Sequence, residues 1–127
     1  MKENMIKVVK VEVGQAPIVK EIANELNALQ AEVDGLIECV YLDDGCIAVV
    51  NEEGKINGME PNRRMGADII CGPFFICGDD GENFASLTDE QIENYSLKFQ
   101  KPELFTGEEP ELEARMTFIR FDYFGGR

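Results

Sequence analysis

Two apolar segments on either side of a short polar turn constrain the fold of this chain more than any other feature. Residues 36–42 and 46–50 are mostly apolar, and Asp43, Asp44 and Gly45 separate them. An Asp-Gly turn between two apolar runs is typical of an antiparallel β-hairpin. We therefore expect an antiparallel sheet that includes these two strands.

Two further segments have the composition of strands. Residues 5–13 place valine and isoleucine among lysines, which predicts an opening strand. Residues 67–78 form a long apolar run that Gly72 and Pro73 interrupt. Because proline cannot donate a hydrogen bond to a neighbouring strand, we expect this strand to bend or bulge at Pro73, or to lie at a sheet edge.

The segment between the hairpin and this run gives weaker signals. Residues 51–54 (Asn-Glu-Glu-Gly) predict a turn, and residues 55–58 predict a short strand. Residues 59–66 show no apolar periodicity, so we interpret them as a loop.

A helical spacing of apolar residues follows Pro17. This spacing predicts a helix that begins at Pro17 and ends before Gly35, which is suited to the position after a helix. The apolar residues recur every three or four positions and are Ile18, Ile22, Leu26, Leu29 and Val33.

A second helix is predicted by the residues of its first turn. Thr88 and Gln91 have the spacing of a capping box, in which each side chain bonds to the backbone N–H of the other residue. Leu87 and Ile92 have the spacing of the hydrophobic staple that accompanies such a box. We expect this helix to continue to about Phe99.

These elements predict an α+β domain with a mostly antiparallel sheet of about five strands, two helices packed on it, and a C-terminal strand. A chain of 127 residues with 44% apolar residues is long enough to form one such core. We expect residues 1–100 to form a single domain, followed at residues 101–127 by an acidic linker and an aromatic strand. That last strand either completes the sheet, forms a homodimer, or docks on a target.

The charge balance limits the partners that this chain can bind. It has 25 acidic and 12 basic residues and a net charge of −13. This excess repels nucleic acid and anionic membranes, so we expect basic proteins or small ligands as partners. Residues 1–4 lead into a strand without a signal-peptide pattern, and no apolar run approaches the ~20 residues of a membrane span. We therefore expect a cytoplasmic protein, located in the cytosol of a host cell.

The sequence lacks the common catalytic motifs. It has no histidine, the residue that most often transfers protons near neutral pH and binds zinc. It also has no G-x-S-x-G nucleophile elbow and no glycine-rich phosphate-binding loop. We therefore expect a protein that is not an enzyme, with no catalytic residue, no cofactor and no metal site.

Four cysteines are present: Cys39, Cys46, Cys71 and Cys77. Neither neighbouring pair has the C-x-x-C spacing of a zinc or redox site. We interpret all four as small buried hydrophobic residues. The alternatives are a disulfide between Cys39 and Cys46, or a metal site made of four thiolates.

Most of the negative charge lies in residues 79–113. This segment is either a solvated face or a surface that occupies a basic cleft, as inhibitors that mimic DNA do. The residues that we expect to bind such a partner are Asp79, Asp80, Glu82, Glu108, Glu109 and Glu111, together with Phe118, Phe121 and Tyr123.

A basic pair gives an alternative site. Arg63 and Arg64 follow Asn62 in the segment that we interpret as a loop, and they are the only adjacent basic residues in the chain. They either form exposed ion pairs of little energy or, with Asn62, bind a planar anion, since arginine can donate two parallel hydrogen bonds.

The order and spacing of several short motifs resemble the domain-of-unknown-function family 3846. The motifs are Glu21-Ile22-x-Asn24-x-Leu26-x-x-Leu29-Gln30, Leu42-Asp43-Asp44, residues 50–55, Gly58, Asn62-Arg63, Ile70-x-Gly72-x-Phe74 and residues 86–92. The resemblance covers about residues 5–100. It implies a small protein of phages and conjugative elements, for which a role in host takeover or against host defence is expected. It implies no catalytic residues, and the acidic and aromatic C-terminal segment lies outside it.

These observations predict a non-enzymatic binding protein of a mobile genetic element. Its expected activity is anti-defence inhibition of a basic, nucleic-acid-handling host protein, such as a CRISPR effector, by occlusion with an acidic surface. The alternative is a protein that sequesters an anionic nucleotide through Asn62, Arg63 and Arg64. An enzyme is the third hypothesis.

Overall fold

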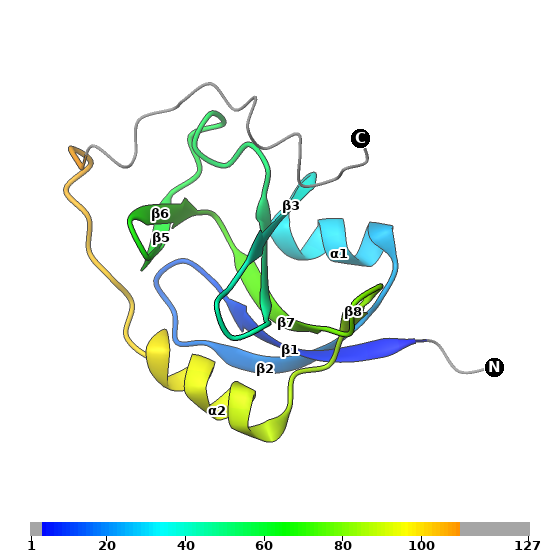
Figure 1. The fold of residues 1–127 in the computed structure, drawn as a ribbon. Helices are drawn as coiled ribbons and strands as arrows, with labels where there is room; N and C mark the ends of the chain where they lie inside the picture. The colour runs from blue at the N-terminus through cyan, green and yellow to red at the C-terminus, as the bar shows by residue number, and fades with distance from the viewer. Residues whose placement is uncertain (1–3, 110–127) are drawn as a thin grey trace.

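The computed structural model describes residues 4–109, which form an antiparallel sheet with one helix on each face (Figure 1). The predicted α+β class is confirmed. The strands are β1 (Met5–Val11), β2 (Ile18–Ala23), β3 (Ile37–Tyr41), β4 (Ile47–Asn51), β5 (Pro61–Met65), β6 (Asp68–Cys71), β7 (Phe74–Asp79) and β8 (Phe84–Ala85). The helices are α1 (Leu26–Val33) and α2 (Asp89–Lys98).

The main sheet has the strand order β2-β1-β7-β4-β3, and every neighbouring pair is antiparallel. The short strand β8 pairs with the end of β7, and β5 pairs with β6 in a separate two-stranded sheet. The predicted hairpin is therefore confirmed as β3 and β4. Strand β7 lies at the centre, and Phe74, Phe75 and Ile76 are completely buried there.

Side chains that alternate along the strands build two separate cores. On the α1 face, Val8 and Phe75 pack with Val33 of the helix. On the α2 face, Val9 and Phe74 pack with residues that include Phe99, just after α2. Because successive residues of a strand point to opposite faces, a central strand that is apolar throughout needs a helix on each side. Figure 1 shows the two helices on opposite sides of the sheet.

The prediction of one helix from Pro17 to Gly35 is wrong in its first half. Residues Ile18–Ala23 form strand β2, which pairs with β1, and the helix covers only Leu26–Val33. An apolar spacing of four residues fits one face of a strand as well as one face of a helix, because four is also a multiple of two. The residues before β2 connect it to β1 as a hairpin, with Gly14 at a φ of 75°.

Two predictions for the segment after β4 are also wrong. Residues 55–58 form turns and not a strand, and residues 59–66 contain strand β5. Strand β5 lacks apolar alternation because its buried positions, Asn62 and Arg63, are polar. The interruption predicted at Gly72 and Pro73 is confirmed, since it separates β6 from β7.

Both helices are fixed at an end by polar side chains. The predicted capping box of α2 is confirmed: the Thr88 hydroxyl accepts from the Gln91 amide at 3.1 Å, and Gln91 Oε1 accepts from the Thr88 amide at 2.9 Å. At the C-terminal end of α1, the buried side chain of Asn51 donates from Nδ2 to Val33 O at 2.9 Å. Neither helix in residues 4–109 has the length and apolar character that a membrane crossing requires.

The four cysteines are buried as free thiols, as the favoured interpretation predicted. Cys39 packs in the core on the α1 face, whereas Cys46 packs in the core on the α2 face. The sheet separates these two thiols, so the alternative of a disulfide between them is wrong.

Replacing Asn51 by alanine should lower the free energy of unfolding by roughly 1–3 kcal/mol, because it removes the donor to the C-terminal carbonyls of α1. Asn57→Ala provides a matched control, since Asn57 is exposed in a turn. Urea denaturation measures both changes. Equal effects of the two substitutions would contradict this role for Asn51.

Candidate functional site

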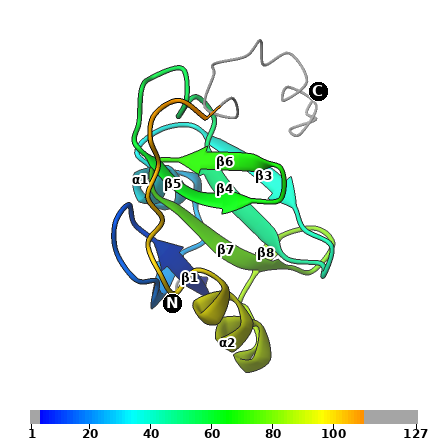
Figure 2. The ribbon, with the colours of Figure 1, turned by 90° about the vertical axis from the view of Figure 1, so that its left-hand side faces the viewer.

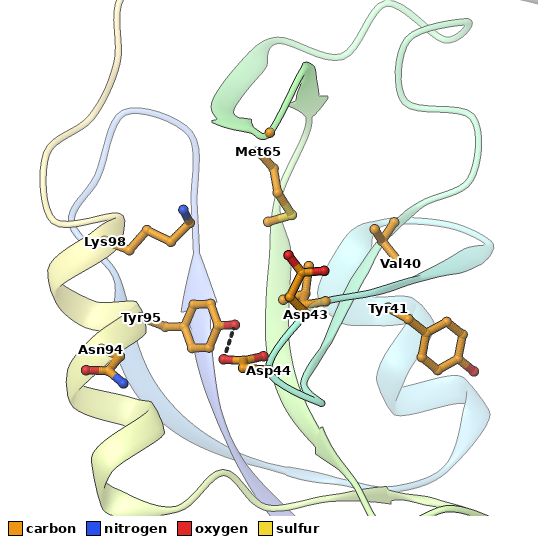
Figure 3. A pocket seen from close by; sticks show the side chains of 10 residues that line it. Val40, Tyr41, Asp43, Asp44, Met65, Asn94, Tyr95 and Lys98 are labelled. Carbon is orange, nitrogen blue, oxygen red and sulfur yellow. Dashed lines mark hydrogen bonds between the residues drawn. The ribbon is translucent and has the colours of Figure 1, made fainter.

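A groove of about 560 Å³ lies between α2, the β3–β4 turn and the β5–β6 turn (Figure 3). We call it the α2 groove. Its walls combine apolar and charged side chains, and its lining residues are Val40, Tyr41, Leu42, Asp43, Asp44, Met65, Gly66, Asn94, Tyr95 and Lys98. The apolar members on β3 and β5 are half-buried at the margin of the core on the α2 face.

A hydrogen bond from helix to turn fixes the base of this groove. The Tyr95 hydroxyl of α2 donates to Asp44 Oδ2 at 2.7 Å, and the Cys46 amide donates to Asp44 Oδ1 at 3.0 Å (Figure 3). Partial burial raises the pKa of Asp44, but these hydrogen bonds outweigh it, and the pKa lies below its ordinary value. Burial and the neighbouring carboxylate raise the pKa of Tyr95, so the phenol remains protonated.

A second groove of about 420 Å³ lies on the α1 face of the sheet, at the same end. We call it the acidic groove, because Glu25, Asp79 and Glu82 line it and its lining includes no lysine or arginine. Its floor is apolar and includes Leu29 and Phe84. The two grooves share Tyr41, a residue that is 58% exposed.

The acidic loop between β7 and β8 is held by its own aspartates. Asp79 Oδ1 accepts from the Gly81 amide at 2.9 Å. Asp80 Oδ1 accepts from the amides of Glu82 at 3.0 Å and Asn83 at 2.8 Å. These backbone hydrogen bonds lower the pKa of Asp80. The loop therefore presents ionised carboxylates in a defined conformation.

The β3–β4 turn lies at the same end of the sheet as this loop. Ile47, the first residue of β4, pairs with Cys77 near the end of β7. Asp43 and Asp44 therefore project from the sheet end that also carries Asp79 and Asp80. We call this region, with Asp43, Asp79, Asp80 and Glu82 exposed at it, the acidic end.

Several basic residues away from the acidic end form ion pairs within the protein. Lys10 is buried on the α1 face and contacts Glu32 at 2.7 Å, and Lys20 contacts the same carboxylate at 2.9 Å. Lys55 pairs with Asp68 near the β5–β6 hairpin. Among residues 4–109, the ion pairs within 4 Å use none of the carboxylates of the acidic end. The charge of the acidic end is therefore directed to solvent.

Arg63, which the sequence suggested as an anion-binding residue, is completely buried. Its Nε and Nη2 donate to Phe99 O, at the C-terminus of α2, at 3.2 and 2.9 Å. Nη2 also donates to Gln15 O at 2.6 Å, and Nη1 donates to Asn62 Oδ1 at 2.8 Å. Burial lowers the pKa of Arg63, while the charge of Glu103 opposes that shift. The guanidinium is thus used by the fold and presents no open face to an anion.

The other two residues of this predicted site have different environments. Asn62 is buried and donates to Val11 O at 3.1 Å and to Gly72 O at 2.9 Å. Arg64 is exposed, its guanidinium lies 5.6 Å from the centre of the Phe105 ring, and its amide donates to Glu103 at 3.2 Å. The structure therefore does not bring the three side chains together around one ligand site.

The residues predicted to bind a basic partner divide into separate groups. Asp79, Asp80 and Glu82 are together at the acidic end, whereas Glu108 and Glu109 follow α2 on a segment that runs past β5 (Figure 2). Figures 1 and 2 both show this segment, yellow to orange, well away from the β7–β8 loop. The remaining predicted residues, Glu111, Phe118, Phe121 and Tyr123, lie outside the described residues.

Sequence reasoning missed Glu25, Asp43 and Tyr41 as members of the site region. Glu25 falls in the segment that we predicted as a continuous helix, so its position beside the β7–β8 loop was not foreseen. The alternating apolar pattern of β3 does assign Tyr41 to a strand. The pairing of β4 with β7 brings Tyr41 close to Asp79. Because these strands are distant in sequence, no local sequence pattern predicts this contact.

The described side chains show no reactive thiol. Burial raises the pKa of Cys39 and of Cys46 to about 11, and it also raises the pKa of Cys71 and Cys77. All four are therefore protonated near neutral pH. Within residues 4–109, no group of three cysteine, aspartate or glutamate side chains is placed to hold a metal ion.

A family model described as a domain of unknown function (DUF3846) matches residues 6–100. The matched residues extend from β1 through α2 and include both Arg63 and the β7–β8 loop. No curated protein and no solved structure matches the chain. Because the match covers most of the sequence, the chain belongs to the DUF3846 family.

Replacing Arg63 by methionine should lower the free energy of unfolding by roughly 2–4 kcal/mol, since it removes the donor to the buried oxygens Phe99 O and Asn62 Oδ1. Arg64→Met is the matched control. Because Arg64 is exposed, we expect it to cost less than about 1 kcal/mol. Urea unfolding of both variants tests this, and a loss for Arg63→Met no larger than for the control would contradict the structural role.

Replacing Tyr95 by phenylalanine should raise the pKa of Asp44 toward its ordinary value, because a donor to the carboxylate is lost. A carboxylate with a lowered folded pKa stabilises the protein above its unfolded pKa of about 3.9, and this contribution is lost as the pH falls through the folded pKa. The stability difference between wild type and variant should therefore be about 1 kcal/mol at neutral pH and shrink in acid.

The pKa of Asp44 is measured directly by carbon-detected NMR titration of its carboxyl group. Tyr41→Phe removes a hydroxyl from the same groove and serves as the control. A pKa for Asp44 that is the same in Tyr95→Phe as in the wild type would contradict the coupling of α2 to the turn.

Proposed function

We propose that this member of the DUF3846 family is a non-enzymatic binding protein whose acidic end occupies a basic surface of another protein. The observation that supports this most strongly is the β7–β8 loop, in which Asp79, Asp80 and Glu82 are exposed, fixed by backbone hydrogen bonds and outside the internal ion pairs. A surface that binds nucleic acid carries lysine and arginine, and closely spaced carboxylates are complementary to it.

The rigidity of the loop favours binding. Asp79 and Asp80 already accept hydrogen bonds from the loop backbone, so less conformational freedom is lost when a partner binds. Their charges also raise the association rate with a basic partner through long-range attraction. The apolar floor of the adjacent acidic groove adds a surface that excludes water around the charged contacts.

The biological setting that we propose is a phage or conjugative element. The target would then be a host defence protein that handles nucleic acid, such as a CRISPR effector, and the acidic end would block its nucleic-acid cleft. The large negative charge of the chain fits this role, because it prevents the protein from competing for the nucleic acid itself.

The thiols and grooves favour this function over its alternatives. A nucleophilic role needs an ionised thiol or an activated hydroxyl, and the raised pKa of Cys39 and Cys46 opposes the former. Anionic nucleotides need cationic groups, but both grooves present carboxylates, and Lys98 is the only basic residue among their lining residues. Arg63 is engaged by carbonyl oxygens.

The test uses a triple variant, Asp79→Asn, Asp80→Asn and Glu82→Gln, which removes three charges and keeps the side-chain oxygens that accept loop hydrogen bonds. The control variant neutralises three exposed acids elsewhere: Glu21, Glu53 and Glu60 to glutamine. Immobilised wild type and both variants are incubated with lysate of a bacterial host, and retained proteins are identified by mass spectrometry. Association rates with the retained partner are then measured by surface plasmon resonance.

We expect a basic protein that the wild type and control retain and the triple variant loses, with association slowed by about tenfold or more at low salt. The rate for the wild type should fall steeply as salt rises, because salt screens the attraction. An association rate that is equal for the two variants, or insensitive to salt, would overturn the proposal.

A further inference from the structure

The two faces of the main sheet are covered unequally. Helix α1 packs across β2, β3, β4 and β7, so it spans the sheet from one edge to the other. Helix α2 makes its main strand contact with β1, and the β5–β6 hairpin lies beyond β7 on the same face (Figure 2). The α2 groove is the space left between these two covering elements.

The side chains around this space have the burial of an incomplete core. Val40 and Leu42, at the end of β3, and Met65, at the end of β5, pack against the core on the α2 face but remain half-buried. Tyr41 beside them is more than half exposed. In Figure 3, Met65 points into the space between α2 and β3, with Lys98 on one side and Asp43 on the other. An apolar space of this kind, with one carboxylate and one ammonium at its rim, is suited to an aromatic peptide that also carries charge.

The segment that follows α2 passes close to this groove. After α2, Phe105 lies against Arg64 of β5, and Glu103 accepts from the amide of the same arginine. The next residue of β5, Met65, lines the groove. Phe118 lies nine positions after Glu109, the last described residue, and a connection of this length can span up to about 30 Å when extended.

We propose that residues 116–124 of the same chain occupy the α2 groove. This segment contains Phe118, Phe121, Tyr123 and Phe124, and each aromatic ring can bury on the order of 150–250 Å². Its charge is opposite in sign to that of the whole chain. Residues 114–127 contain three arginines and one aspartate, whereas the whole chain has a net charge of −13. A basic, aromatic segment thus matches a groove whose rim carries the carboxylate of Asp43.

With residues 116–124 in the groove, these residues, α2 and the β5–β6 hairpin would together cover the α2 face of the sheet. Within the segment, Arg120 has the charge to pair with Asp43, and Asp122 has the charge to pair with Lys98 across the groove. The half-buried side chains of Val40 and Met65 then become core residues. This contact shares Asp43 with the acidic end, whereas Asp79, Asp80 and Glu82 of the β7–β8 loop lie outside the lining of the α2 groove.

The absence of tryptophan from the sequence allows a direct test. Phe121→Trp in the full-length chain introduces a single indole, whose fluorescence reports burial of this segment alone. We expect a blue-shifted emission and roughly fivefold less quenching by acrylamide than for free N-acetyltryptophanamide, because a packed ring excludes the quencher. The protection should not change when the protein is diluted by about a hundredfold, because an intramolecular contact does not depend on the protein concentration.

A second substitution in the same chain locates the contact. Asp43→Arg reverses a charge at the rim of the groove and should increase quenching toward the free value. Glu53→Arg makes the same change in another exposed turn and should leave the protection intact. Circular dichroism establishes that both variants keep the fold.

Three results would overturn the proposal. Full quenching in Phe121→Trp itself would show that the segment does not dock. Protection that disappears on dilution would show that it binds a second copy. Protection that is unchanged in Asp43→Arg, or equally lost in Glu53→Arg, would show that it binds elsewhere.

Discussion

The hydrogen bonds of the buried Arg63 guanidinium hold together the parts of this domain that are distant in sequence. They connect strand β5 to the carbonyl of Phe99 at the end of α2 and to the carbonyl of Gln15 in the β1–β2 turn. The acceptors of its hydrogen bonds are neutral oxygens, so the charge is stabilised by charge-assisted hydrogen bonds and by the negative end of the α2 dipole. Burying a cation without such partners costs free energy, so a rearrangement that breaks these hydrogen bonds is disfavoured.

The molecule has two ends with different chemistry. Asn51 at the end of β4, Asn62 with its bonds to Val11 and Gly72, and Arg63 all lie at one end of the sheet, where polar side chains bind backbone carbonyls. The β3–β4 turn and the β7–β8 loop lie at the other end, where carboxylates face solvent. Several of the basic residues stabilise the fold, whereas the carboxylates of the acidic end take part in none of the ion pairs within 4 Å among residues 4–109. This separation is the physical basis of the proposed binding role.

The sequence predicted elements whose signals are local and failed where distant contacts decide the structure. The capping box of Thr88 and the hairpin around Gly45 depend on neighbouring residues, and both are confirmed. Residues 18–23 have a spacing that suits helix and strand alike, and pairing with β1 decides for the strand. The acidic loop was identified as a candidate surface from charge alone. The burial of Arg63 was not foreseen, because its partners come from segments 36 and 48 positions away.

The Arg63 guanidinium is bound by the fold, whereas the carboxylates of the acidic end remain available to a partner. Hydrogen exchange of the arginine Nε–H groups, followed by nitrogen-15 NMR in the intact protein, tests this difference most directly. We expect the Arg63 Nε–H, which donates to Phe99 O, to exchange slowly and to be unaffected by added nucleotides, whereas that of exposed Arg64 exchanges fast. Equally fast exchange at both arginines, or a shift of the Arg63 signal on addition of a nucleotide, would contradict the account.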